Sequence, residues 1–497
     1  MQILSAQQIK ELDDFTCANE PITSINLMER AAEALCEEIG VREGYLNLTI
    51  ICGKGNNGGD GLALARLISK NGIPVHVIVI DYTTNSSPNF LINLKRLPKK
   101  NIAFLETTVS PAIPADNIII DALLGTGLSR PLSGVLADVV QQINSLPNRV
   151  ISIDIPTGLF CEDNSGNNPK HVVQAEQTLT FHCPKLSFFF AENAAFVGHF
   201  DVLNIGLLEQ KSGVVSANKW VKEKDVKALL RPRHPFSHKG TFGHGLLLAG
   251  RYGSMGAAVL SAKACMRSGV GLVTVHVPTL GVTILQTAIP EAMCSVDTGD
   301  TTIESLPKLD HFSAIGMGPG IGKEKDTANA LKRLLQDCNV PLVLDADALN
   351  ILSENKTWLS FLPANTVLTP HSKEFDRLAG PSESGYDRWK KQHEFAMRYN
   401  CVVVLKGAYT SVCNPAGQTF FNSTGNAGMA TAGSGDALTG LIVGLLAQGY
   451  SPTEAAIVGV YLHGLAGDIA AKEQGQEAMI ASDIIKAFGS AFLRLTT

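Results

Sequence analysis

Residues 48–61 read LTIICGKGNNGGDG, and this stretch decides the fold class of the first part of the chain. It begins with a continuous apolar run, Leu48–Cys52, which is typical of a strand buried on both faces of a parallel sheet. A glycine-rich loop follows, and then a helical stretch over residues 61–70. A strand, a glycine-rich loop and a helix in this order predict the first unit of a doubly wound α/β domain.

The same alternation of strands and helices continues along the first part of the chain. Further apolar runs bounded by Gly, Pro or Asp lie at residues 75–80, 118–124 and 150–155, and a helical stretch lies at 134–143. We therefore expect a doubly wound, Rossmann-like α/β domain over residues 1–215.

A polar segment without periodicity, residues 210–224, is the expected linker to a second domain. Beyond it the alternation starts again and ends in a long apolar helical segment, residues 435–448. This pattern predicts a second α/β domain over residues 222–497. Its strand-like runs lie at residues 245–249, 272–277, 341–344, 366–368 and 401–405.

The composition excludes several classes of protein. Of 497 residues, 45% are apolar and 18% are charged, so each half can bury a core, and a net charge of -5 favours neither nucleic acid nor acidic lipid. Ten cysteines without Cys-x-x-Cys or zinc spacing are typical of a reducing compartment. The chain begins without a secretory signal and has no apolar stretch of roughly 20 residues. We expect a cytoplasmic protein that binds neither nucleic acid nor membranes.

The glycine-rich loop predicts an anion-binding site. Five glycines, two Asn and one Asp in residues 53–61 allow positive φ and a close approach of a ligand to the backbone. A helix beginning near Gly61 would offer free N–H groups to a phosphate. The same loop fits the dinucleotide fingerprint G-x-G-x-x-G, and Asp81 ends the next strand where a ribose-binding acid is expected. A Rossmann dehydrogenase is therefore an alternative.

Two more strand ends carry carboxylates. Asp121 leads into the loop GTGLSRP at residues 125–131, and Asp154 leads into Ile-Pro-Thr-Gly at residues 155–158. Ligands of such sheets bind beyond the carboxyl ends of the strands, so these loops are expected to converge with the glycine-rich one. An Asp at a strand end can also merely cap a helix, but the combination of three loops predicts a site.

These motifs, in this order, resemble the NAD(P)H-hydrate epimerase domain, also called the YjeF N-terminal domain, over roughly residues 1–210, and the segment Phe181–Lys185 fits it too. The resemblance implies a potassium ion held by oxygens of Asn57, Asp121 and Thr157. It also implies that Asp154 contacts the substrate, and we expect Asp154 to move the proton when the hydroxyl-bearing ring carbon is inverted. The other implied substrate-binding residues are Asn56, Asn57, Gly58, Gly59, Asp60, Gly125, Thr126, Gly127, Leu128, Ser129, Arg130 and Pro131.

The second domain carries the sequence TAGSGD at residues 431–436, which runs directly into the apolar helix. Gly433 and Gly435 free the backbone amides to form an anion hole at the helix N-terminus. Asp436, in the first turn, could accept the proton of a hydroxyl group that attacks a phosphoryl group. The sequence has no P-loop pattern. These features favour phosphoryl transfer over a plain helix cap.

This motif resembles the ribokinase-like superfamily, and further segments narrow the resemblance to the NAD(P)H-hydrate dehydratase family over about residues 225–497. The segments are residues 253–258, 290–293, 316–320, 345–350, 369–371 and 406–410. The resemblance implies that the substrate is bound by Ala257, Gly320, His371 and Asp436. It implies that an adenine nucleotide is bound by Lys406, Gly407, Ala408, Tyr409, Thr410 and Gly435. In bacterial bifunctional members the phosphoryl donor is ADP, with magnesium.

One position departs from the dehydratase pattern. These enzymes usually have a glycine directly before the glutamate of the Thr-Pro-His segment, where this chain has Lys373 before Glu374. Because Lys enters positive φ less readily than Gly, the sequence leaves the local loop shape at this position open.

Together the resemblances imply a bifunctional repair enzyme for hydrated NADH and NADPH. The first domain would interconvert the R and S epimers, and the second would phosphorylate the hydroxyl of the S epimer and expel phosphate, a far better leaving group than hydroxide. We expect NADHX or NADPHX and ADP as small-molecule partners, and a homo-oligomer. The alternatives are a Rossmann oxidoreductase fused to a vitamin-precursor kinase, and a first domain that only binds ligands.

Overall fold

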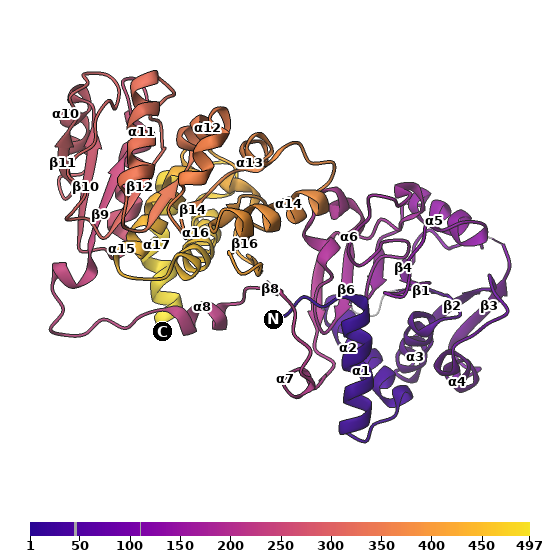
Figure 1. The fold of residues 1–497 in the computed structure, drawn as a ribbon. Helices are drawn as coiled ribbons and strands as arrows, with labels where there is room; N and C mark the ends of the chain where they lie inside the picture. The colour runs from indigo at the N-terminus through magenta and orange to yellow at the C-terminus, as the bar shows by residue number, and fades with distance from the viewer. Residues whose placement is uncertain (44–46, 110) are drawn as a thin grey trace. The chain divides into compact units, whose positions relative to one another are not determined.

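Parallel strands build one sheet in each half of the chain (Figure 1). The computed structural model describes residues 1–43, 47–109 and 111–497. The described chain divides into two units, residues 2–216 with 384–386, and residues 217–383 with 387–497 and Met1. The predicted α/β fold is therefore confirmed.

The first unit contains a seven-stranded sheet in the order β3-β2-β1-β4-β5-β6-β7, in which every neighbouring pair is parallel. The order reverses between β1 and β4, which is the point where doubly wound sheets bind ligands. Its strands are β1 (Leu48–Cys52), β2 (Val75–Ile80), β3 (Ile102–Thr107), β4 (Ile118–Ala122), β5 (Val150–Ile153), β6 (Gln177–Phe181) and β7 (His199–Leu203).

Helices cover both faces of this sheet. Successive residues of β1 point to opposite sides, since Ile50 packs in the core beneath α2, α3 and α4, whereas Ile51 packs in the core beneath α5. Near-continuous apolar runs are therefore needed, as the sequence indicated. The helices are α1 (Ala6–Asn19), α2 (Ser24–Glu43), α3 (Asn56–Lys70), α4 (Pro88–Arg96), α5 (Val135–Ser145), α6 (Ala194–Val197) and α7 (Glu209–Ser212).

The second unit contains a ten-stranded sheet in the order β11-β10-β9-β12-β13-β14-β15-β16-β17-β8, and only the pairs that include β16 are antiparallel. The segment expected as a linker contributes to it, because β8 pairs with β17. The strands are β8 (Asn218–Trp220), β9 (His244–Leu248), β10 (Leu272–Val277), β11 (Met293–Val296), β12 (Ala314–Met317), β13 (Leu342–Leu344), β14 (Val367–Leu368), β15 (Val402–Leu405), β16 (Ser411–Cys413) and β17 (Thr419–Phe421).

Two helical layers enclose the second sheet (Figure 1). One core joins the sheet to α9, α15, α16 and α17, and the other joins it to α11–α14. Helix α15 is buried over residues 437–447, so its N-terminus is rigidly placed. The helices are α8 (Glu223–Leu229), α9 (Met255–Arg267), α10 (Val282–Ala288), α11 (Lys325–Asp337), α12 (Ala346–Glu354), α13 (Ser372–Ala379), α14 (Gly385–Arg398), α15 (Ser434–Ala447), α16 (Pro452–Gln474) and α17 (Ala481–Thr496).

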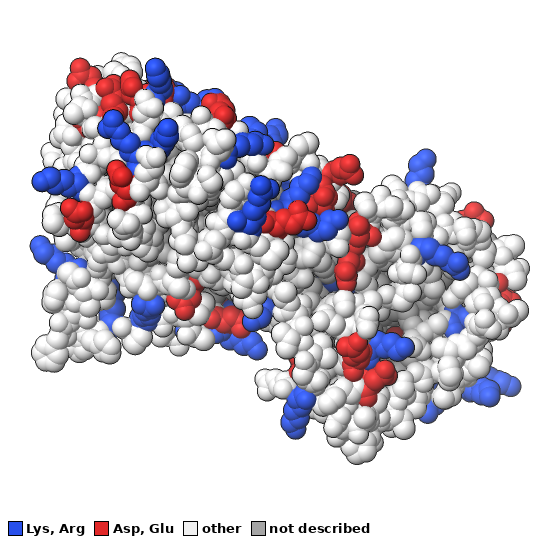
Figure 2. Space-filling view, in the orientation of Figure 1, with Lys and Arg blue, Asp and Glu red and all other residues white. Residues whose placement is uncertain are grey.

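No helix among the described residues is long and apolar enough to cross a membrane. On the face shown in Figure 2, Lys and Arg side chains are interspersed with Asp and Glu, in agreement with the small net charge.

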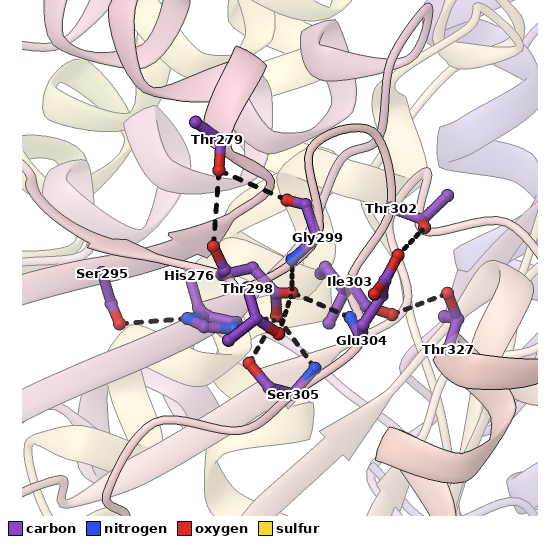
Figure 3. Close-up of polar contacts among 11 residues, drawn as sticks. His276, Thr279, Ser295, Thr298, Gly299, Thr302, Ile303, Glu304, Ser305 and Thr327 are labelled. Carbon is purple, nitrogen blue, oxygen red and sulfur yellow. Dashed lines mark hydrogen bonds and ion pairs between the residues drawn. The ribbon is translucent and has the colours of Figure 1, made fainter.

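A buried carboxylate anchors the edge of the second sheet (Figure 3). Asp297 follows β11, and its side chain accepts hydrogen bonds from the amides of Gly299, Glu304 and Ser305 at 2.7–3.1 Å. His276 of β10 lies 2.6 Å from Asp297 and its other ring nitrogen contacts Ser295. Burial alone would raise the pKa of Asp297, but these hydrogen bonds lower it below its usual value.

We expect Asp297→Asn to destabilise the second unit by about 3 kcal/mol, since hydrogen bonds to a charged group contribute roughly 1.5–3 kcal/mol each and the amide replaces only part of them. Because the folded-state pKa of Asp297 is lowered, its contribution is present above the unfolded pKa of about 4 and is lost as the pH falls through the folded value. Urea unfolding should give a lower free energy of unfolding for the variant than for the wild type. This difference in free energy should become smaller as the pH is lowered. Asp300→Asn, on the exposed part of the same loop, is the control and should leave the free energy of unfolding and its pH dependence unchanged.

Candidate functional site

A cavity of about 680 Å³ lies at the carboxyl edge of the first sheet, where the strand order reverses. Its wall combines α1, the start of α3, the loop after β4, Asp154 and the segment after β6. Of the predicted substrate-binding residues, those that line it are Asn56, Asn57, Asp60, Gly125, Thr126, Gly127, Leu128 and Asp154. Gly58 and Gly59 are buried behind the wall, and Ser129, Arg130 and Pro131 are exposed and do not line it.

Helix α3 begins at Asn56, five residues before the predicted start, with Gly55 as its N-cap. The motif asparagines therefore lie in the first helical turn, whose amides have no acceptor within the helix and are free for an anion. No glycine of residues 53–61 has a positive φ, so the conformation that glycine allows is not used in this loop, and close packing is what requires glycine there. A Cβ on Gly58 would lie 1.8 Å from the Gly53 carbonyl oxygen.

We expect Gly58→Ala to destabilise the first unit by roughly 1–3 kcal/mol or more, since the added methyl group would overlap rigid backbone. Gly55→Ala is the matched control, because its Cβ meets nothing within 4 Å and its φ of −91° suits alanine. Thermal unfolding monitored for each unit measures both effects. Equal stability of the two variants would contradict the packing argument.

Asp154 is held by an ion pair with a buried lysine. Lys185, with 1% of its side chain exposed, donates to Oδ1 of Asp154 at 2.7 Å. The same oxygen accepts from the Phe181 amide at 3.1 Å and the Thr180 hydroxyl at 3.3 Å. Asp154 also adopts a φ of +66°, an uncommon conformation for a residue other than glycine. The carboxylate thus has one fixed position at the cavity wall.

Two further carboxyl groups of this cavity have perturbed pKa values. Burial, and then the charge of Asp154, raise the pKa of Asp13 to about 7. Burial, then Asp154 and Asp13, raise the pKa of Asp60 well above its usual value. Asp13 and the role of Lys185 were missed from the sequence. A lysine in the apolar segment around Lys185 was the available signal, whereas Asp13 lies far from every motif.

Two of the residues implied for potassium, Asp121 and Thr157, contact each other, and the third, Asn57, lines the cavity beside Gly125. Asp121 is fully buried, and its carboxylate accepts from the Thr157 hydroxyl at 2.7 Å, the Thr157 amide at 2.8 Å and Ser152 at 2.8 Å. Asn57 is buried, and its amide nitrogen Nδ2 has no hydrogen-bond partner among the described residues. That nitrogen is a donor and cannot bind a cation, so the fit to potassium depends on the oxygens of the set, which are the Asp121 carboxylate, the Thr157 hydroxyl and Asn57 Oδ1. The described residues contain no cluster of three His, Cys, Asp or Glu side chains that could hold a metal.

The second candidate site surrounds the N-terminus of α15. Gly433 is the N-cap, with a φ of +86°, and Asp436 lies in the first turn. Burial, and then the charge of Asp345, raise the pKa of Asp436 to about 6, whereas Lys406 opposes the shift. Lys406 pairs with Asp345 at 2.9 Å, and the Thr439 hydroxyl donates to the other oxygen of Asp345 at 2.7 Å.

Other predicted residues of this site lie on three parts of the second unit. Ala257 and Gly320 are adjacent, because a Cβ on Gly320 would lie 3.0 Å from that of Ala257. His371 caps α13 and forms a parallel bridge with Lys406, so it lies beside the lysine. Gly407, Ala408, Tyr409 and Thr410 form the turn after β15, with Gly407 and Ala408 exposed. Asp345 and Thr439, which hold Lys406 in place, received no role from the sequence.

The structure resolves the backbone conformation at Lys373, which the sequence left open. Residues 372–379 are helical, and Lys373 does not have a positive φ. Its amide, with that of Glu374, donates to the ring nitrogen of His371. Because the position is helical, lysine fits it without strain.

A doubly wound domain with a carboxylate–lysine cavity, joined to a ribokinase-like domain with an anion hole beside a carboxylate, defines a two-domain α/β enzyme. Family models match both units: residues 24–187 match the YjeF-related protein N-terminus, and residues 245–489 match NAD(P)H-hydrate dehydratase. The bifunctional NAD(P)H-hydrate repair enzyme of Moorella thermoacetica is 35% identical, over 98% of this chain and 95% of the relative. The enzyme of that name from Escherichia coli is 34% identical, over 93% of this chain and 88% of the relative.

The chain belongs to the family of bifunctional NAD(P)H-hydrate repair enzymes. The predicted family and the predicted class of activity are confirmed. Among solved structures, the ADP/ATP-dependent NAD(P)H-hydrate dehydratase of Bacillus subtilis, co-crystallised with ATP and Mg²⁺, is 30% identical with a TM-score of 0.48, and it covers 56% of this chain and 98% of that one.

Proposed function

We propose that the chain repairs hydrated NADH and NADPH in two steps. The first domain, within residues 1–215, interconverts the R and S epimers at the Asp154 cavity. The second domain, within residues 222–497, dehydrates the S epimer with ADP as phosphoryl donor. The observation that carries the proposal is the position of Asp436, a partly buried carboxyl group in the first turn of α15 beside the amides of Gly433–Gly435.

The dehydratase step uses each part of this arrangement. The ring hydroxyl passes its proton to Asp436 while its oxygen attacks the terminal phosphorus of ADP, and AMP leaves. The helix amides stabilise the charge on the phosphoryl oxygens. The lone pair of the ring nitrogen then expels phosphate, and loss of a proton from the neighbouring ring carbon gives NAD(P)H. Magnesium would arrive with the nucleotide, since it is held mainly by phosphate oxygens and water.

The remaining site assignments follow the contacts of the described residues. Ala257, Gly320 and His371 bind the hydrated substrate, and Lys406, paired with Asp345, binds the nucleotide with residues 407–410 and Gly435. A lysine fixed by a buried carboxylate is a point charge for phosphate oxygens. Three contacts support these assignments: Gly320 lies beside Ala257, Gly435 lies beside the Lys406 ammonium group, and His371 is bridged to Lys406.

Asp436→Asn should lower the rate of dehydration by roughly 10²-fold or more, because the side chain accepts the proton. The affinity for ADP should stay near normal, because the backbone amides bind the phosphate. In the wild type, kcat should fall below about pH 6, because Asp436 must be ionised to act as base and its pKa is raised to about 6. Recovery of NADH absorbance and calorimetry with ADP and magnesium measure these effects. Glu473→Gln, on the exposed side of α16, is the control. If Asp436→Asn keeps the wild-type turnover, then Asp436 is not the catalytic base and only caps the helix.

Asp154→Asn should lower the rate of epimerisation by roughly 10²–10⁴-fold and leave dehydration of the S epimer intact. The variant also leaves Lys185 buried without its partner, which costs about 3–5 kcal/mol. The double variant with Lys185→Met should regain stability but not activity, which separates chemistry from folding. Chromatography of the two epimers measures the rate, and Asp116→Asn on the exposed surface is the control. Unchanged interconversion in Asp154→Asn rules this carboxylate out.

We also propose that potassium is held by Asn57, Asp121 and Thr157. When bound, the ion supplies a positive charge that balances the buried carboxylate. The buried carboxylate of Asp121, in contact with the Thr157 hydroxyl, supports the assignment, because hard cations take oxygen ligands.

A homo-oligomer is proposed from the edge of the second sheet. Leu280, Ile284, Met293 and Val296 are 42–55% exposed there, on β11, α10 and the turn before α10. An apolar edge strand favours a covering partner, and a second copy would supply one. No disulfide joins the cysteines in the described part of the chain, which supports a reducing, cytoplasmic setting.

A further inference from the structure

We propose that Asp13 is a second catalytic residue of the first domain, a general acid that protonates the departing hydroxyl group while Asp154 accepts the proton of the entering water. The inference rests on the proposed epimerase function of this cavity. It adds to that function a division of labour between two carboxyl groups on different elements.

The position of Asp13 is set by α1, which forms one side of the cavity. Lining residues recur along this helix at intervals of three and four, so one face of α1 looks inward, and Asp13 lies near the middle of that face. The lining residues of α1 are Ala6, Ile9, Lys10, Asp13, Asp14 and Cys17. Asp154 reaches the same cavity from the end of β5.

The two carboxyl groups have contrasting surroundings. Three donors converge on Asp154, including the buried ammonium group of Lys185. Asp13 makes no hydrogen bond or ion pair with any residue that the structure describes, although it lies partly buried. Two nearby carboxyl groups in such different surroundings are suited to opposite roles, one as acid and one as base.

The charges around Asp13 favour its protonated form near neutrality. Burial is the largest effect, followed by repulsion from Asp154, and together they raise the pKa of Asp13 to about 7 against the attraction of Lys185. Asp14 of α1 adds a smaller repulsion. The other titratable groups of the cavity are Lys10 of α1, Asp60 of α3, Cys17 of α1 and His182 after β6. An acid with a pKa near the working pH transfers protons most effectively.

The resulting step is balanced. The carboxyl proton of Asp13 moves to the ring hydroxyl oxygen, the carbon–oxygen bond breaks, water leaves, and the lone pair of the ring nitrogen forms a carbon–nitrogen double bond. Water then adds to the other face of that carbon and gives its proton to Asp154. Both carboxyl groups exchange protons with solvent before the next turnover. The reverse reaction uses the same groups.

The test compares Asp13→Asn with Glu11→Gln, an exposed position on the same helix, in the full chain. Asp13→Asn should lower kcat for epimerisation by roughly 10²-fold or more with little change in KM, and Glu11→Gln should not. In the wild type, activity should fall above about pH 7 as Asp13 ionises, and this alkaline limb should disappear in Asp13→Asn. Asp13→Glu should restore part of the rate.

Three outcomes decide between the explanations. Dehydration of the S epimer and thermal unfolding of Asp13→Asn should match the wild type, which shows that the variant folds. If Asp13→Asn keeps the wild-type rate, or loses the rate but keeps the alkaline limb, then Asp13 is not the acid. A wild-type chain that dehydrates the S epimer but does not interconvert epimers would overturn the proposed function of the cavity, and this inference with it.

Discussion

A lysine ammonium group buried against an aspartate at the end of a parallel strand holds each candidate site together. Lys185 pairs with Asp154 after β5, and Lys406 pairs with Asp345 after β13. A buried charge without a partner is costly, so each pair fixes the relative position of a strand end and a later segment.

The pairs also set the electrostatics of their sites. Asp154 adds a negative charge that raises the pKa values of Asp13 and Asp60, and Asp345 does the same for Asp436, in each case after the larger effect of burial. In both domains the ion pair therefore stands beside a carboxyl group whose pKa is nearer neutrality. The same physical arrangement serves two unrelated reactions, because each needs a proton acceptor or donor beside a fixed charge.

The sequence predicted most of the central strands and the motif residues, but not the interior strands β6 and β12, the strands at the sheet edges, or the contacts between residues far apart in the chain. Strands such as β2 and β10 are buried on both faces and are therefore apolar throughout. The edge strands β3 and β11 were not predicted either. They are less buried than the central strands, and polar residues interrupt their apolar pattern, Glu106 and Thr107 in β3 and Ser295 in β11. Asp13 could not be placed because its significance depends on Asp154, more than a hundred residues later, and only the fold brings them to one cavity.

The short strand β8 has a consequence for how the protein is made. Its residues 218–220 follow the first unit almost directly, yet they pair with residues 419–421 of β17. During translation the epimerase domain can fold as soon as it has left the ribosome, whereas β8 must wait for about 200 more residues to emerge before its neighbour exists. The second sheet is therefore completed late, and until β17 has emerged the shortness of β8, which has three residues, limits its wrong pairing.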